Sequence, residues 1–142
     1  MAVTQPIKIL FLCTHNSCRS QMAEGLANHF LGDRFQAFSA GTEATRVNPL
    51  AIKVLAELGI DVSGQYSKTM DVFEGEVFDH VVTLCGDANE KCPLFIGGVQ
   101  RVHKGFADPS RLVGDTDDVV PKFRQVRDEI KEWLMNYFGE TE

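Results

Sequence analysis

The chain has 142 residues, of which 44% are hydrophobic and 24% charged, and its formal net charge is −6. This length and composition are typical of one globular domain, so we expect a single domain over residues 1–142. The negative charge argues against nucleic acid and anionic membranes as partners, because both bind basic surfaces. A single compact domain also favours a monomer.

The N-terminal residues, MAVTQP, carry no basic segment, and the apolar stretch after them is interrupted by Lys8. That stretch is too short for a signal peptide or a membrane span, so we expect a cytoplasmic protein. In a reducing compartment, the four cysteines of the chain are more typical of catalysis or metal binding than of structural disulfides.

The first predicted element is a buried parallel strand, because an apolar run rich in Ile, Leu and Phe extends from Ile7 to Cys13. A short polar loop follows, and helical spacing of apolar residues then predicts a helix over about residues 18–31. Cys13 therefore lies at a strand-to-helix turn, and Arg19 and Ser20 lie in the first turn of the helix.

Strands and helices alternate along the rest of the chain. We expect a strand at residues 34–40, a helix capped by Asn48 and Pro49 and closed by Gly59, a short helix at 70–74, strands at 79–84 and 99–103, and a last helix after the acidic residues 115–118. The core-facing residues of the last helix are predicted to be Phe123, Val126, Ile130, Leu134 and Tyr137. This order predicts an α/β fold in three layers, with a four-stranded parallel sheet flanked by helices on both faces.

Ligands of such sheets bind at the carboxyl ends of the strands. Cys13 ends the first predicted strand, and Cys85 follows the strand predicted at residues 79–84. The two thiols are therefore expected to share one site.

The loop after Cys13 predicts an oxyanion site, because N–H groups at a helix N-terminus and the helix dipole attract anions. The candidate oxyanion-binding residues are Thr14, His15, Asn16, Ser17, Cys18, Arg19 and Ser20. The planar guanidinium of Arg19 can hold two oxygens, and Ser20 can donate a hydrogen bond to the sulfur of Cys13. Cys13 is the candidate nucleophile; the alternative, a purely structural cysteine, fits the strand-to-helix context less well.

Three nearby residues have simpler interpretations. Cys18 has no task that the anion site requires, so we interpret it as a core residue. His15 could tune anion affinity when protonated or face solvent, and we favour the second. His103 is interpreted as a strand-end residue.

Asp108 is a candidate general acid, because Pro109 keeps the residue before it extended and can hold its carboxyl on a loop. Taken alone, the Asp-Pro pair is only a turn signal.

Together these residues resemble the low-molecular-weight protein tyrosine phosphatase-like family and, within it, the thioredoxin-coupled arsenate reductases. The likeness covers nearly the whole chain and rests on residues 13–25, 39–41, 82–93 and the pair Asp108-Pro109. The phosphatase loop (P-loop) alone does not separate the two activities. Cys85 and Cys92, seven positions apart, mark the reductase branch.

The resemblance implies arsenate reduction through three thiols. Cys13 would form a covalent adduct with arsenate, Cys85 would attack Cys13 and release arsenite, and Cys92 would resolve the disulfide that remains. Thioredoxin would be the reductant and protein partner, no cofactor would be tightly bound, and phosphate or sulfate would act as analogues of arsenate.

The resemblance also implies a support for the loop. In some relatives a potassium ion is held by residues matching Asn16 and Ser39 and by an acidic residue where this chain has Lys68. We expect the Lys68 ammonium to replace the ion and to order Asn16 directly, so a potassium site is not expected. A solvated surface lysine is the alternative.

Two other functions compete with this one. A phosphatase would use Cys13, Arg19 and Asp108, but the chain continues after Pro109 with Ser110-Arg111, without the aromatic pair of phosphotyrosine enzymes. A zinc or iron–sulfur module would use all four cysteines, yet their spacing fits the usual metal knuckles poorly.

Overall fold

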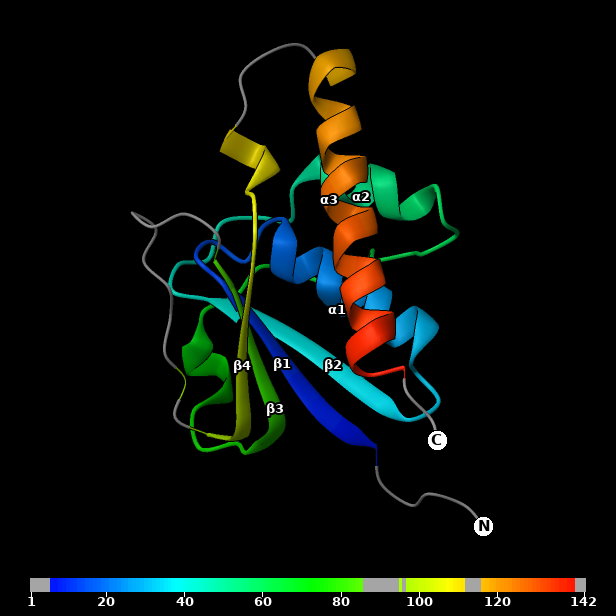
Figure 1. Cartoon of the computed structure of the whole chain (residues 1–142). Helices are drawn as coiled ribbons and strands as arrows, with labels where there is room; N and C mark the ends of the chain where they lie inside the picture. The colour runs from blue at the N-terminus through cyan, green and yellow to red at the C-terminus, as the bar shows by residue number, and fades with distance from the viewer. Residues whose placement is uncertain (1–5, 86–94, 96, 112–115, 140–142) are drawn as a thin grey trace.

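The structure, a computed structural model, describes residues 6–85, 95, 97–111 and 116–139. Strands and helices alternate as predicted up to residue 85, whereas the described residues include no helix between the strands that end at Cys85 and begin at Gly98 (Figure 1). In chain order they are β1 (Ile7–Cys13), α1 (Arg19–Phe30), β2 (Phe35–Gly41), α2 (Pro49–Ala56), the 3₁₀ helix η1 (Met70–Phe73), β3 (Phe78–Cys85), β4 (Gly98–Phe106), the 3₁₀ helix η2 (Pro109–Arg111) and α3 (Thr116–Tyr137). In this part of the chain, every helix is too short or too polar to cross a membrane.

The four strands form one parallel sheet in the order β2-β1-β3-β4. Both faces of β1 are buried because it is an inner strand, which explains why its sequence is a continuous apolar run. Cys13 pairs with Gly41 of β2, and Leu12 pairs with Thr83 of β3. These strands therefore end at the same edge of the sheet, where the β1–α1 loop begins.

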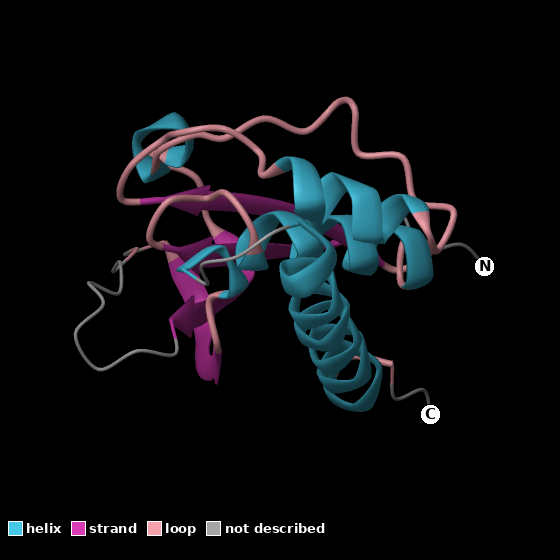
Figure 2. Cartoon of the chain, turned by 90° about the horizontal axis from the view of Figure 1, so that it is seen from above, coloured by secondary structure: helices cyan, strands magenta, loops and turns pink. Residues whose placement is uncertain are grey.

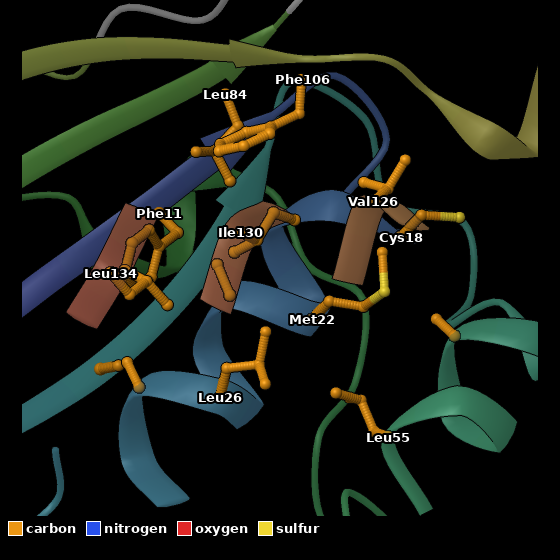
Figure 3. Close-up of a cluster of buried hydrophobic side chains, with 14 of the residues drawn as sticks. Phe11, Cys18, Met22, Leu26, Leu55, Leu84, Phe106, Val126, Ile130 and Leu134 are labelled. Carbon is orange, nitrogen blue, oxygen red and sulfur yellow. The ribbon is translucent and has the colours of Figure 1, made fainter. Parts of the chain in front are cut away.

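Successive residues of β1 enter two different cores, because side chains alternate across a strand. Ile9 and Phe11 pack into the larger core, which α1, α2 and α3 cover (Figure 3). Leu10 and Leu12 pack on the opposite face with Phe73 of η1. Figure 2 shows η1 apart from the group of three α-helices. The predicted three-layer α/β fold is confirmed, and the helix on the second face is η1.

Two contacts fix α2. The Asn48 side chain accepts a hydrogen bond from the N–H of Leu50 (2.8 Å), which confirms the predicted cap before Pro49. After the helix, Glu57 binds Arg124 and Arg127 of α3, each at 2.8 Å. The second contact ties the α2 region to α3.

Three details of the prediction are wrong. Tyr137 is 45% exposed, whereas Phe138 is 5% exposed and belongs to the core, because the buried face of α3 continues four residues after Leu134. His103 lies within β4 and not at its end, and β4 continues to Phe106. The longer strand brings its last residues to the edge where β1 ends.

Candidate active site

The β1–α1 loop, residues 14–18, depends on two residues for its shape. Asn16 has a φ of 50° and is the one non-glycine residue with positive φ among the described residues. Asparagine tolerates this conformation better than most residues do. At Gly41, a Cβ atom would lie 2.6 Å from the carbonyl oxygens of Cys13 and Thr14. The end of β2 therefore lies so close to the loop that residue 41 has no room for a side chain.

Carbonyl groups of the loop are hydrogen-bonded to segments outside it. The pairs are Thr14 O with Glu43 N (3.0 Å), His15 O with Ser67 Oγ (3.1 Å), Asn16 O with Gln21 Nε2 (3.0 Å) and Ser17 O with Asn48 N (3.0 Å). In a trans peptide the N–H of the next residue points away from the carbonyl, so the N–H groups of residues 15–18 point away from these four partners. Such N–H groups before a helix can hold a tetrahedral oxyanion.

Cys13 lies at the end of β1 and is buried. Its Sγ lies 2.9 Å from the Oγ of Ser20, which is the contact that the sequence predicts. Ser20 Oγ in turn accepts a hydrogen bond from Asn16 Nδ2 (2.8 Å). The candidate nucleophile therefore has a hydroxyl group beside it that can donate to the sulfur.

Arg19 is buried at the start of α1, and its guanidinium spans the ends of two strands. Nη1 donates to the main-chain oxygens of Leu84 (3.4 Å) and Phe106 (3.2 Å). Nη2 lies 3.5 Å from Oδ2 of Asp108. These contacts hold the positive charge next to the loop, where it can attract an anion.

Asp108 lies between β4 and η2, and its side chain is 10% exposed. Its Oδ1 accepts hydrogen bonds from the N–H (3.0 Å) and the hydroxyl (2.7 Å) of Ser110. The carboxyl therefore faces Arg19 with one oxygen and the start of η2 with the other. The structure thus brings the predicted general acid next to the predicted anion-binding arginine.

Cys85 is the last residue of β3 and is buried. Since Leu12 pairs with Thr83, the end of β1 at Cys13 is level with Leu84, one residue before Cys85. The two cysteines therefore end neighbouring strands at the same edge, as predicted. Cys92, the third predicted thiol, lies outside the described residues.

Cys18 lies between the loop and α1 and belongs to the larger hydrophobic core, where Figure 3 shows its side chain. Burial, with a smaller contribution from the negative charge of Asp108, raises the pKa of the Cys18 thiol to about 12. A thiol with this pKa is protonated at neutral pH and is a weak nucleophile. The geometry agrees with the interpretation of Cys18 as a core residue.

Lys68 is buried, but its ammonium does not have the predicted role of ordering Asn16 directly. The main-chain N–H of Lys68 donates to Asn16 Oδ1 (2.9 Å), whereas Nζ donates to the main-chain oxygen of Tyr66 (2.9 Å). Nζ also lies 4.0 Å from Glu24 Oε1, and Ser39 donates to the same carboxylate oxygen. The Lys68 ammonium therefore contacts Tyr66 and Glu24, whereas the main-chain N–H of the same residue contacts Asn16.

Glu24 and Lys68 form a buried ion pair. Burial raises the pKa of Glu24. The hydrogen bond from Ser39 and the positive charge of Lys68 oppose this increase. Burial likewise lowers the pKa of Lys68, and the Glu24 carboxylate opposes that shift. Among the described residues, no group of three or more His, Cys, Asp and Glu side chains could hold a metal ion.

His15 is half exposed, and its Nε2 lies 3.4 Å from Oε1 of Glu43. This position agrees with the interpretation that His15 faces solvent.

Sequence reasoning missed three polar residues behind the loop. Gln21 and Glu24 of α1 contact the predicted residues Asn16 and Ser39, respectively, and Gln65 contacts Gln21. A signal was present in the sequence, since Gln21 and Glu24 interrupt the apolar residues of the first helix. Gln65 gave no such signal, because residues 62–68 show no periodicity.

The chain is similar to known proteins over most of its length. The family described as low molecular weight phosphotyrosine protein phosphatase matches residues 8–142. The arsenate reductase of Bacillus subtilis (strain 168) is 49% identical over 136 residues, which cover 94% of this chain and 95% of that protein.

Two solved structures have similar folds. An arsenate reductase in the phosphate binding state has a TM-score of 0.72 and 35% identity, and the match covers 92% of this chain and 95% of that chain. A thioredoxin-dependent arsenate reductase of Corynebacterium glutamicum has a TM-score of 0.60 and 27% identity, with 94% of this chain and 63% of that chain covered. The motifs, the fold and these comparisons agree: the chain belongs to the low molecular weight phosphotyrosine protein phosphatase family.

Proposed function

We propose that this protein reduces arsenate to arsenite with a relay of three thiols, Cys13, Cys85 and Cys92, and that thioredoxin regenerates it. The similar proteins named arsenate reductase support the reaction. The neighbour named as thioredoxin-dependent supports the choice of reductant.

The observation that supports the proposal most is that Cys13 and Cys85 end two neighbouring strands at the same edge of the sheet. Cys13 and Cys85 end the neighbouring strands β1 and β3, and Arg19 binds the main-chain oxygen of Leu84, next to Cys85. An oxyanion held by Arg19 and the loop N–H groups would lie beside both cysteines. A hydrolytic phosphatase needs Cys13 but has no use for the second thiol.

In the first step, the Cys13 thiolate bonds to arsenic, and one arsenate oxygen takes up protons and leaves as water. Asp108, next to Arg19, is the proposed donor of one of these protons. The loop N–H groups and Arg19 stabilise the negative charge of the other oxygens.

In the second step, Cys85 attacks the Cys13 sulfur and forms a disulfide. The sulfur–arsenic bond breaks, and its electron pair stays on arsenic, which passes from As(V) to As(III) and leaves as arsenite. The thiol proton of Cys85 passes to solvent or to the leaving arsenite.

In the third step, the Cys92 thiolate attacks Cys85 and releases the Cys13 thiolate. The dithiol of thioredoxin then reduces the disulfide between Cys85 and Cys92, so two electrons pass from thioredoxin to each arsenate. This chemistry requires a reducing compartment, so we place the protein in the cytoplasm, acting as a monomer of one domain without a tightly bound cofactor.

We propose a residual phosphatase activity as a second function of the same site. Arsenate and phosphate have the same shape and charge, and Asp108 lies close enough to Arg19 to protonate the leaving oxygen of a phosphate ester. We expect this activity to be much slower than arsenate reduction, with p-nitrophenyl phosphate as the test substrate.

The test of the main proposal is a coupled assay with thioredoxin, thioredoxin reductase and NADPH. We expect NADPH oxidation to depend on arsenate. Replacing Cys92→Ser should stop turnover but leave a single burst of one arsenite per chain. Normal turnover of this variant with thioredoxin would contradict the relay.

A further inference from the structure

Three side-chain amides form a continuous hydrogen-bonded chain behind the β1–α1 loop. Gln65 Nε2 donates to Gln21 Oε1 (2.8 Å), and Gln21 Nε2 donates to Asn16 Oδ1 (2.9 Å). Asn16 Nδ2 donates to Ser20 Oγ (2.8 Å). Asn16 and Gln21 are 0% exposed, and Gln65 is half-buried. The chain ends at Cys13, whose sulfur lies 2.9 Å from Ser20 Oγ.

A main-chain group fixes the direction of the Asn16 amide. The N–H of Lys68 can only donate, and it lies 2.9 Å from Asn16 Oδ1. The oxygen of this amide must therefore face Lys68, and its nitrogen must face Ser20.

Main-chain groups also fix the two glutamines. The main-chain oxygens of Asn16 and Tyr66 can only accept, and they lie 3.0 and 3.1 Å from Gln21 Nε2. The main-chain oxygen of Gln21 likewise lies 3.1 Å from Gln65 Nε2. All three amides therefore donate in one direction, from Gln65 toward Ser20.

Gly25 of α1 allows the segment that carries Gln65 to approach the helix. A Cβ atom at Gly25 would lie 3.0 Å from Val62 Cγ1 and 3.4 Å from Gln65 Oε1. The close packing holds the glutamine pair in place.

We infer that Gln21 and Gln65 are positioning residues that, together with the Lys68 N–H, hold Asn16 in the orientation that directs the Ser20 hydroxyl toward Cys13. Because Ser20 Oγ receives a hydrogen bond from Asn16, its own hydrogen is left to donate to the sulfur. A donor directed at the sulfur favours the thiolate, which is the attacking form. The inference rests on the proposed function, since it concerns the same nucleophile, but its test requires no arsenate.

The test must separate this effect from other charges near Cys13. The neighbouring elements carry the charged and titratable residues His15 and Cys18 of the loop region, Arg19 of α1, Cys85 of β3 and Asp108 after β4, with the pair Glu24 and Lys68 behind the loop. All of these remain unchanged in the variants below.

The main variant is Gln65→Glu in the reduced full-length chain. It keeps the size of the side chain but replaces the donor with a carboxylate, which cannot donate to Gln21 Oε1. Gln21 then loses the contact that holds it from behind, and its hydrogen bond to Asn16 Oδ1 is expected to weaken. Gln36→Glu is the matched control, because Gln36 is exposed on β2. Gln65→Met removes the donor without adding a charge.

The measurement is the pH profile of Cys13 alkylation by iodoacetamide, with the modified cysteine identified by mass spectrometry and folding checked by thermal unfolding. We expect Gln65→Glu to move the profile to higher pH and to slow alkylation at pH 7 about fivefold. Gln65→Met should move it in the same direction by less, and Gln36→Glu should match the unchanged protein.

Two results would overturn the inference. One is a profile of Gln65→Glu that coincides with that of Gln36→Glu in a folded protein. The other is a shift with Gln65→Glu that is absent in Gln65→Met, because it would show an effect of charge alone. If the glutamate variant does not fold, Gln21→Met provides the same comparison. A failed arsenate assay with normal alkylation shifts would contradict the proposed function and leave this inference standing.

Discussion

Cys13 and Cys18 lie five positions apart at the start of the same site, yet their surroundings differ. They are buried alike, with 2% and 3% of their surfaces exposed. The Cys13 sulfur lies 2.9 Å from the Ser20 hydroxyl, whereas the Cys18 sulfur lies 3.8 Å from the Ser17 hydroxyl and Cys18 packs in the larger hydrophobic core. Burial alone therefore does not identify a nucleophilic cysteine. The two sulfurs differ in that Cys13 has a short contact with a hydroxyl that Asn16 holds in place.

The largest loss of activity is expected when Cys13 is replaced, and the same replacement at Cys18 is its control. Cys13→Ser should lower arsenate reduction at least about a thousandfold, because it removes the nucleophile. Cys18→Ser should change the rate less than about twofold, although burying a hydroxyl in the core should cost about 1–3 kcal/mol of stability. Steady-state rates and thermal unfolding of both variants check the pair, and a large loss of activity with folded Cys18→Ser would break the comparison.

Arg19 is proposed to hold the anion that Cys13, and not Cys18, attacks. Arg19→Lys should lower kcat/KM for arsenate about a hundredfold, because lysine cannot bind Leu84, Phe106 and an oxyanion with one planar group. Kinetics over a range of arsenate concentrations measure this effect. Activity close to that of the unchanged protein would show that the guanidinium geometry is not required.

The Ser20 hydroxyl lies 2.9 Å from the Cys13 sulfur, which is closer than the 3.8 Å between the Ser17 hydroxyl and the Cys18 sulfur. Ser20→Ala should lower the rate of arsenate reduction about tenfold, since a hydrogen bond to a charged group is lost. Ser20→Thr keeps the hydroxyl and should recover part of the rate. Equal rates for the alanine and threonine variants would argue against a role of this hydroxyl.

The smallest effect on activity is expected at Glu57, far along the chain from both cysteines. Its contacts with Arg124 and Arg127 lower the pKa of Glu57 from 4.5 to about 2. A lowered pKa stabilises the fold above pH 4.5, and this stabilisation is lost as the pH falls toward 2.

Glu57→Gln should therefore lower Tm at pH 7 without changing the rate of arsenate reduction, and the difference in Tm should shrink toward pH 2. Thermal unfolding at a series of pH values checks this. A difference in Tm that persists at the lowest pH would show that the ion contacts are not its cause.

Much of the fold follows from local patterns in the sequence. The apolar run before Cys13 predicts β1, and the helical spacing from Phe123 to Leu134 predicts α3. The prediction that Tyr137 lies on the buried face is wrong, since Phe138 takes that position. Spacings of three and four residues both occur on one helix face, so the pattern did not decide between these neighbours.

The site was predicted where it depends on short spacings and missed where it depends on distant contacts. Cys13, Arg19 and Ser20 lie within one strand-loop-helix segment, so their sequence pattern already implies proximity. Gln65 meets Gln21, 44 positions away, through a segment without periodicity. The predicted contact between the Lys68 ammonium and Asn16 is wrong for the same reason, because the position of the ammonium depends on how that segment folds back on α1.

The three-thiol relay is best tested by mapping the disulfide that forms when folded Cys92→Ser reacts with one equivalent of arsenate. The proposed relay predicts a bond between Cys13 and Cys85, together with one arsenite per chain, and a reduced Cys18. A bond between Cys13 and Cys18, or arsenite release without any disulfide at Cys85, would contradict it.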